Sequence, residues 1–131
     1  LFFVKVVFLS GDRTVNEMMA KNRRIPFHSA RGKDKADFVE LFEQKYNTKR
    51  EEMLYIGDDL FDLSIMQKVG FSFCPQDSPN KLKNHCGHGN IIQANGGENV
   101  VAKMLDILLD RGLVGDCTMQ EIEKLDKQEK F

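Results

Sequence analysis

Short, continuously apolar runs alternate along this chain with longer stretches in which apolar residues recur every three or four positions. The apolar runs are typical of strands buried on both faces of a sheet, and they occupy residues 1–9 (apart from Lys5), 53–56 and 71–74. The stretches with helical periodicity are residues 15–23, 35–46, 60–69 and 100–109. Gly70 and Gly112 stand where caps of the last two helices belong. Strands that alternate with helices predict an α/β fold: a doubly wound, Rossmann-like parallel sheet with helices on both faces.

Three carboxylates follow the second apolar run at a sharp turn. The run ends at Gly57, and Asp58, Asp59 and Asp62 come at the first, second and fifth positions after it. Open α/β sheets bind ligands at the carboxyl ends of their strands, and crowded carboxylates raise one another's pKa unless a cation joins them. Oxygen-only ligands suit a hard ion such as Mg2+, which takes one or two carboxylates and completes its shell with water and phosphate. The alternative is a surface turn in which Asp58 or Asp59 caps a helix.

Groups that suit a phosphate follow the first apolar run and open the second helical stretch. Ser10 and Gly11 come just before a predicted helix start. A hydroxyl and backbone N–H groups can bind an anion there, although a serine in this position is more often only an N-cap. Lys35 begins a predicted helix, where the helix dipole prefers an anion. A phosphate-binding role would explain Lys35, but an exposed lysine is the commoner case, and Lys33 stands in the same loop.

Composition narrows the function classes. The chain has 131 residues, enough for one core, and its 41% hydrophobic and 30% charged residues are typical of a soluble domain. A net charge of −1 gives no reason to expect nucleic acid or an anionic membrane as a partner. The first apolar run is too short to span a bilayer. Three widely spaced cysteines without a Cys-x-x-Cys pair indicate free thiols in a reducing cytoplasm.

Along the chain, a hydroxyl group is followed by a lysine and then by the acidic turn. This order, with its sequence context, resembles that of the haloacid dehalogenase superfamily of phosphatases. It is similar in particular to the small, capless branch that dephosphorylates 3-deoxy-manno-octulosonate 8-phosphate and related nonulosonate 9-phosphates. Residues 8–13, 34–37 and 55–62 match the family's second, third and fourth motifs, and residues 69–75 and 96–101 also fit this branch. The likeness covers about residues 4–113, within a domain expected at 1–115, and leaves a charged tail at 116–131.

The resemblance implies a Mg2+ cofactor at the acidic turn. Asp58 would be a direct ligand of the ion. Asp59 would bind the ion through water or orient a ligand. Asp62 would complete the metal site by supporting the turn without contacting the ion itself.

The same resemblance assigns the phosphate to other groups. Ser10 would donate to a phosphoryl oxygen, and the backbone N–H of Gly11 would be a second donor. Lys35 would neutralise the phosphate and keep the nucleophile ionised. Arg13 either faces the substrate or is a solvated residue at a helix start. The Gly96-Gly97 pair before the last helix is either an anion-binding nest or a flexible turn.

One part of the family pattern is absent from this sequence. The first motif, a strand ending in Asp-x-Asp, supplies the nucleophile and the general acid, and it should precede residue 1. The resemblance therefore implies a Mg2+-dependent phosphatase that acts on a sugar-acid phosphate through an aspartyl-phosphate, with the nucleophile upstream and this chain alone inactive. Capless relatives are typically tetramers, so we expect a homo-oligomer.

Two other functions fit parts of the pattern. One is a non-catalytic oligomerisation module of the kind attached to sialic-acid cytidylyltransferases. The complete acidic turn argues for a catalytic ancestor, whereas the missing first motif favours this module. The other is a receiver-like domain, which also clusters aspartates with a lysine, but in the reverse order along the chain.

Overall fold

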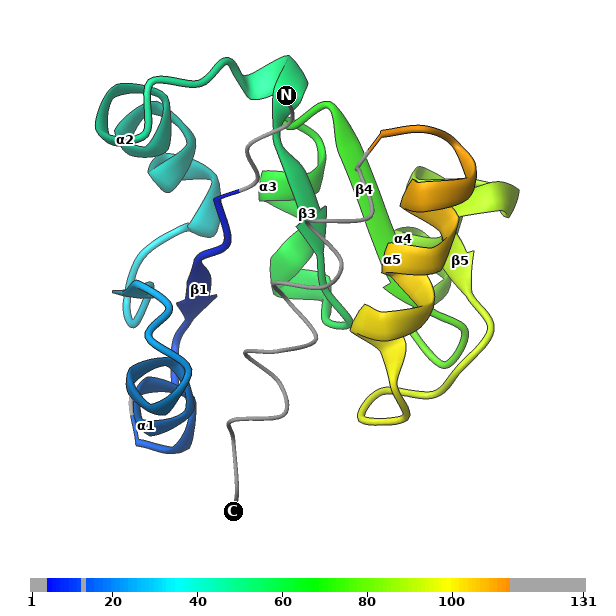
Figure 1. Cartoon of the computed structure of the whole chain (residues 1–131), viewed down its shortest axis with the longest axis horizontal. Helices are drawn as coiled ribbons and strands as arrows, with labels where there is room; N and C mark the ends of the chain where they lie inside the picture. The colour runs from blue at the N-terminus through cyan, green and yellow to red at the C-terminus, as the bar shows by residue number, and fades with distance from the viewer. Residues whose placement is uncertain (1–4, 13, 114–131) are drawn as a thin grey trace. The chain divides into compact units, whose positions relative to one another are not determined.

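The computed structural model describes residues 5–12 and 14–113 (Figure 1). These residues fall into two compact units. One unit takes its described residues from Leu1–Lys33 and Leu105–Phe131, and the other is Asp34–Met104. The predicted tail at 116–131 lies outside the described residues.

The first unit contains a parallel β-α-β arrangement. Its elements are β1 (Phe8–Ser10), α1 (Val15–Asn22) and β2 (Phe27–Ser29). In the parallel pair, Phe8 lies opposite Phe27 and Ser10 lies opposite Ser29. The end of β1 therefore carries the serine that the sequence singles out.

The first strand is shorter than the apolar run predicts. Residues 5–7 are described but lie outside β1, and residues 1–4 are not among those described. The Phe8 N–H donates to the carbonyl of Pro26 at 2.9 Å. Pro26 has no N–H, so it cannot donate the next bond of the parallel ladder to the carbonyl of residue 6, and the pairing ends there.

The second unit holds the remaining strands and most of the helices. Its strands are β3 (Leu54–Ile56), β4 (Phe71–Pro75) and β5 (Ile91–Ile92). Its α-helices are α2 (Phe38–Lys45), α3 (Leu63–Met66) and α4 (Asn80–Cys86), while α5 (Val100–Asp110) crosses the division between the units. Its 3-10 turns are η1 (Lys35–Asp37), η2 (Arg50–Glu52), η3 (Leu60–Asp62) and η4 (His88–Asn90).

The strands of the second unit form a parallel sheet in the order β3-β4-β5. Leu54 lies opposite Phe71, and Cys74 lies opposite Ile91. Figure 1 shows β3 and β4 side by side in green. All described strand pairs in both units are parallel, and helical segments separate successive strands. This arrangement confirms the predicted α/β class.

The core of the second unit lies where α3 and α4 pack on the sheet. Met66, Cys74 and Leu82 are buried together, one from each of α3, β4 and α4. Partly buried apolar side chains surround them, namely those of Tyr55, Leu63, Cys86 and Ile91. Cys74 and Cys86 are free thiols, and Cys117 lies outside the described residues.

Two elements of this unit have no signal in the hydrophobic pattern. The helix α4 buries Leu82 as its one fully buried side chain, so it lacks the repeating apolar face that marks the longer helices. The strand β5 is two residues long, too short for a run to stand out. Within the described residues, no helix is long and apolar enough to cross a membrane.

The two predicted cap glycines serve different purposes. Gly112 has a φ of +70° and its N–H donates to Leu109 O at 3.0 Å, which confirms it as the cap of α5. The prediction for Gly70 was wrong, because Gly70 does not have a positive φ. A Cβ on Gly70 would lie 1.9 Å from the backbone oxygen of Glu51. Glycine is needed there because two backbone segments approach each other closely.

Candidate active site

The acidic turn follows β3 directly and is organised around Asp62. The Gly57 N–H donates to Phe73 O at 3.2 Å, which continues the β3–β4 ladder into the turn. A Cβ on Gly57 would lie 2.5 Å from both Cγ and Oδ2 of Asp62. Glycine at this position therefore lets the Asp62 carboxylate lie against the backbone of the turn.

Both oxygens of the Asp62 carboxylate are occupied by hydrogen bonds. Oδ2 accepts the backbone N–H groups of Asp58 and Asp59, each at 3.0 Å. Oδ1 accepts Lys35 Nζ and the Tyr55 hydroxyl, each at 2.6 Å. Asp62 is only 3% exposed. Burial by itself would raise its pKa, but the hydrogen bonds from Lys35, Tyr55 and the Asp59 backbone outweigh burial and lower the pKa. Asp62 is thus an ionised carboxylate that holds the turn together.

The three carboxylates of the turn have different surroundings. Asp59 Oδ1 accepts the Phe61 N–H at 3.3 Å and caps η3, which matches the alternative function of an N-cap. Among the described residues, no hydrogen bond or ion pair engages the exposed Asp58 side chain. The Asp58 oxygens therefore remain available to a ligand.

The donor set of the turn fits a hard cation only in part. In the described part of the chain, no group of three or more His, Cys, Asp or Glu side chains could hold a metal ion by itself. Mg2+ does not need such a group, since it is commonly bound through one or two carboxylates plus water and substrate phosphate. The oxygens of Asp58 suit this requirement. The assignment of Asp58, Asp59 and Asp62 to a Mg2+ site stays a prediction.

Lys35 reaches the turn from a segment that is distant in sequence. Lys35 is the first residue of η1, and Asp34 caps η1 by accepting the Ala36 N–H. The Lys35 side chain is 19% exposed and forms an ion pair with Asp62. The negative charge of Asp62 explains a lysine at a helix start, where the dipole alone would disfavour it. Of the two candidate lysines, Lys35 is the one that contacts the acidic turn. Lys33 belongs to the other unit.

Ser10 and Gly11 belong to the first unit. Ser10 Oγ accepts the Asp12 N–H at 3.1 Å and Asn16 Nδ2 at 2.8 Å. A hydroxyl has two acceptor positions and one hydrogen, so both acceptor positions are used and the hydrogen is left to donate elsewhere. Gly11 is exposed, with open space where a Cβ would be. Arg13 lies outside the described residues.

Two side chains that hydrogen-bond to candidate site residues, Tyr55 and Asp77, were not predicted from the sequence. Burial and the nearby Asp62 carboxylate raise the pKa of Tyr55, so its hydroxyl stays protonated and donates. Asp77 Oδ1 accepts the Gly96 N–H at 3.0 Å, and a Cβ on Gly96 would lie 3.5 Å from Asp58 Oδ2. The N–H of Gly96 thus meets a protein carboxylate. Asp77 follows β4 at the same sheet edge as the acidic turn, which is the signal that could have identified it.

Comparison with known proteins identifies the family of this chain. The family of haloacid dehalogenase-like hydrolases matches residues 17–105. The chain therefore belongs to this family. The matched region includes Lys35 and the acidic turn and begins after Ser10.

Individual relatives narrow the likeness to one branch. Over 59 residues, or 45% of this chain, the sequence is 36% identical to the 3-deoxy-D-manno-octulosonate 8-phosphate phosphatase of Haemophilus influenzae, and the matched part is 32% of that protein. The cobalt-bound form of the deoxy-D-mannose-octulosonate 8-phosphate phosphatase of the same organism superposes with a TM-score of 0.73 at 28% identity. That likeness covers 83% of this chain and 62% of the other. A hypothetical protein from Xanthomonas campestris shares the fold, with a TM-score of 0.74 at 17% identity over 98% of this chain and 65% of the other.

Proposed function

We propose that this chain is part of a divalent-metal-dependent phosphatase that hydrolyses a phosphorylated sugar acid through an aspartyl-phosphate. The observation that carries the proposal is the Lys35–Asp62 ion pair at 2.6 Å, at a turn whose Asp58 carboxylate has no protein partner among the described residues. The Lys35 ammonium held beside the turn and the Asp58 carboxylate on the turn suit a phosphate with a metal ion. The matched part of the chain spans 32% of the length of the curated relative, and the aspartyl-phosphate route needs a nucleophilic aspartate in addition to the residues assigned here.

The acidic turn is the proposed metal site. Asp58 would bind Mg2+ directly and Asp59 would bind through water, while Asp62 keeps both residues in place through their N–H groups. When bound, Mg2+ would neutralise charge between the nucleophile and the phosphate. The protein itself supplies the rigidity of the turn, because a ligand held by fixed hydrogen bonds needs little reorganisation when the ion binds.

Lys35 is the proposed phosphate cation. An ammonium group has three donors, and Asp62 takes one of them in the structure. The remaining donors can point to phosphoryl oxygens without loss of the ion pair. The Ser10 hydroxyl, which donates to none of the residues that the structure describes, and the N–H of Gly11 would add further donors.

The sugar-acid substrate is proposed from the relatives, whose names specify an octulosonate 8-phosphate. A homotetramer in the cytoplasm is proposed on the same likeness. Val15 and Met18 lie three residues apart on α1 and are 60% and 59% exposed. Two exposed apolar residues on one helix face support assembly.

The test is phosphate release by the full-length protein with an octulosonate 8-phosphate. We expect turnover that EDTA abolishes, and a loss of about 100-fold or more in Lys35→Ala, the scale for removal of one transition-state donor. Lys33→Ala is the matched control and should keep nearly all activity. Metal-independent release, or a greater loss in Lys33→Ala, would overturn the assigned roles. An inactive full-length protein that still assembles would favour the oligomerisation module.

A further inference from the structure

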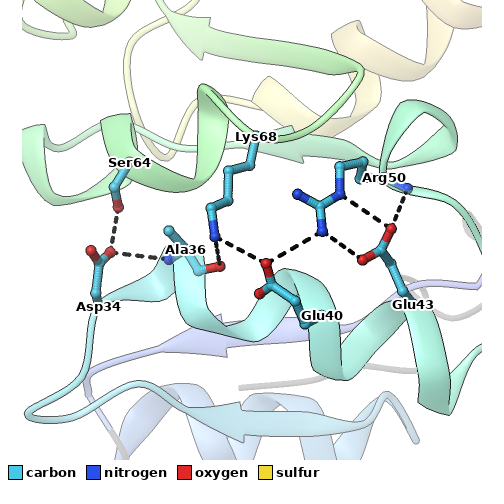
Figure 2. Close-up of polar contacts among 7 residues, drawn as sticks. All are labelled: Asp34, Ala36, Glu40, Glu43, Arg50, Ser64 and Lys68. Atoms are coloured by element: carbon cyan, nitrogen blue, oxygen red, sulfur yellow. Dashed lines mark hydrogen bonds and ion pairs between the residues drawn. The ribbon is translucent and has the colours of Figure 1, made fainter.

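The segment that carries Lys35 is tied to α3 by a second contact beside the Lys35–Asp62 ion pair. Ser64 Oγ donates to Asp34 Oδ1 at 2.5 Å (Figure 2). The same Asp34 oxygen accepts the Ala36 N–H at 3.1 Å. Asp34 immediately precedes Lys35, and Ser64 follows Asp62 by two residues. The two contacts therefore run in parallel between the same pair of segments.

The Asp34 carboxylate is suited to this contact. Its pKa is lowered, first by the hydrogen bond from Ser64 and then by the Ala36 N–H. It is thus ionised at neutral pH and accepts a charge-assisted hydrogen bond, which is stronger than a neutral one. On the other side of Lys35, Lys68 Nζ donates to Ala36 O at 3.4 Å. The backbone on either side of Lys35 is thereby tied to α3 through Ser64 and to the turn after α3 through Lys68.

A series of ion pairs continues from Lys68 along α2. Lys68 Nζ also pairs with Glu40 at 3.1 Å, and Arg50 pairs with Glu40 at 3.3 Å and with Glu43 at 2.8 Å. Figure 2 shows these contacts in sequence, from the Ala36 carbonyl through Lys68 and Glu40 to Arg50 and Glu43. These ion pairs are largely exposed and contribute little each. The Arg50–Glu43 pair offers a control because it holds the same helix without touching the residues next to Lys35.

We infer that Asp34 and Ser64 are positioning residues, whose hydrogen bond holds the Lys35 ammonium opposite Asp62. A lysine side chain has several rotatable bonds and loses much conformational entropy when it is held in one place. The Asp34–Ser64 contact restricts the backbone of the segment that carries Lys35, so the position of the side chain's attachment point is fixed before any ligand arrives. The catalytic consequence rests on the proposed function: a phosphate would meet a cation already in place, which is the benefit of a preorganised site.

The direct test is the reactivity of the Lys35 amine, which requires no enzyme activity. The protein is labelled with a limiting amount of an acetylating reagent, and each lysine is quantified by mass spectrometry, with the exposed Lys81 as internal reference. Loss of one hydrogen bond at an exposed position should increase Lys35 labelling roughly threefold in Ser64→Ala. Ser64→Thr, which keeps the hydroxyl, should restore the slow wild-type rate. Glu43→Gln should leave the Lys35 rate unchanged.

The outcomes separate the two proposals. Equal Lys35 labelling in wild type and Ser64→Ala, with both proteins folded by circular dichroism, would overturn the positioning role. So would the same increase in Glu43→Gln. In the full-length protein, Ser64→Ala should lower kcat/KM about tenfold, within the range found for small misplacements of a catalytic group, and Ser64→Thr should recover it. If wild type itself lacks turnover, the proposed function fails, while the labelling result still decides the positioning role.

Discussion

Replacing Asp62 with alanine should be the most damaging single substitution at the acidic turn. The change removes all four hydrogen bonds of the carboxylate and leaves Lys35, whose side chain is only 19% exposed, without its counter-charge. Breaking a buried ion pair by removing one partner costs about 3–5 kcal/mol, and the partial exposure of Lys35 favours the lower end. Such a loss is a large share of the roughly 5–15 kcal/mol by which a domain is stable.

The assay is urea unfolding of the wild type and of two alanine variants. Asp59→Ala is the matched control, because the Asp59 side chain is exposed and accepts one hydrogen bond of 3.3 Å as a cap. Loss of a cap costs about 0.5–1 kcal/mol. If Asp62→Ala lowers the free energy of unfolding by no more than Asp59→Ala does, the central role of Asp62 in the turn is refuted.

The pH dependence of stability gives an independent check on Asp62. Its pKa in the folded state lies below the ordinary value of 3.8, so the unfolded chain takes up the proton first as the pH falls. The stabilisation is therefore complete above about pH 5 and is lost as the pH drops through 3.8 towards the folded-state pKa. Asp62→Asn should lack this part of the acid dependence. Parallel acid profiles for wild type and Asp62→Asn would contradict the pKa assignment.

Three further outcomes follow from the structure. Tyr55→Phe removes one donor to Asp62 and should cost about 1 kcal/mol in urea unfolding; no measurable change would show that water replaces the hydroxyl. Gly70→Ala places a Cβ 1.9 Å from Glu51 O and should lower the stability of the fold more than Gly112→Ala does. At Gly112, with a φ of +70°, an alanine adds about 1–2 kcal/mol of backbone strain. The reverse order of stability in thermal melting would rule out the close approach at Gly70. Full-length protein should sediment as a tetramer, and a compact monomer at all concentrations would refute the proposed assembly.

The sequence by itself determined the features that depend on local chemistry. Periodicity located the main helices and the strands at β3 and β4, because burial of one helix face or of a whole strand leaves a pattern in consecutive residues. The glycine at position 57 and the carboxylates after it identified the acidic turn. The weak elements α4 and β5 escaped, since a single buried leucine and a two-residue strand leave no pattern.

Only the tertiary structure decided what each polar residue of the turn does. Lys35 meets Asp62 across 27 positions, and Ser64 meets Asp34 across 30. Apart from the family resemblance, local chemistry did not distinguish Lys33 from Lys35, and it did not show which of the three carboxylates is occupied by protein donors. These choices depend on which strand ends and helix starts the fold brings together, and no local rule of spacing or propensity contains that information.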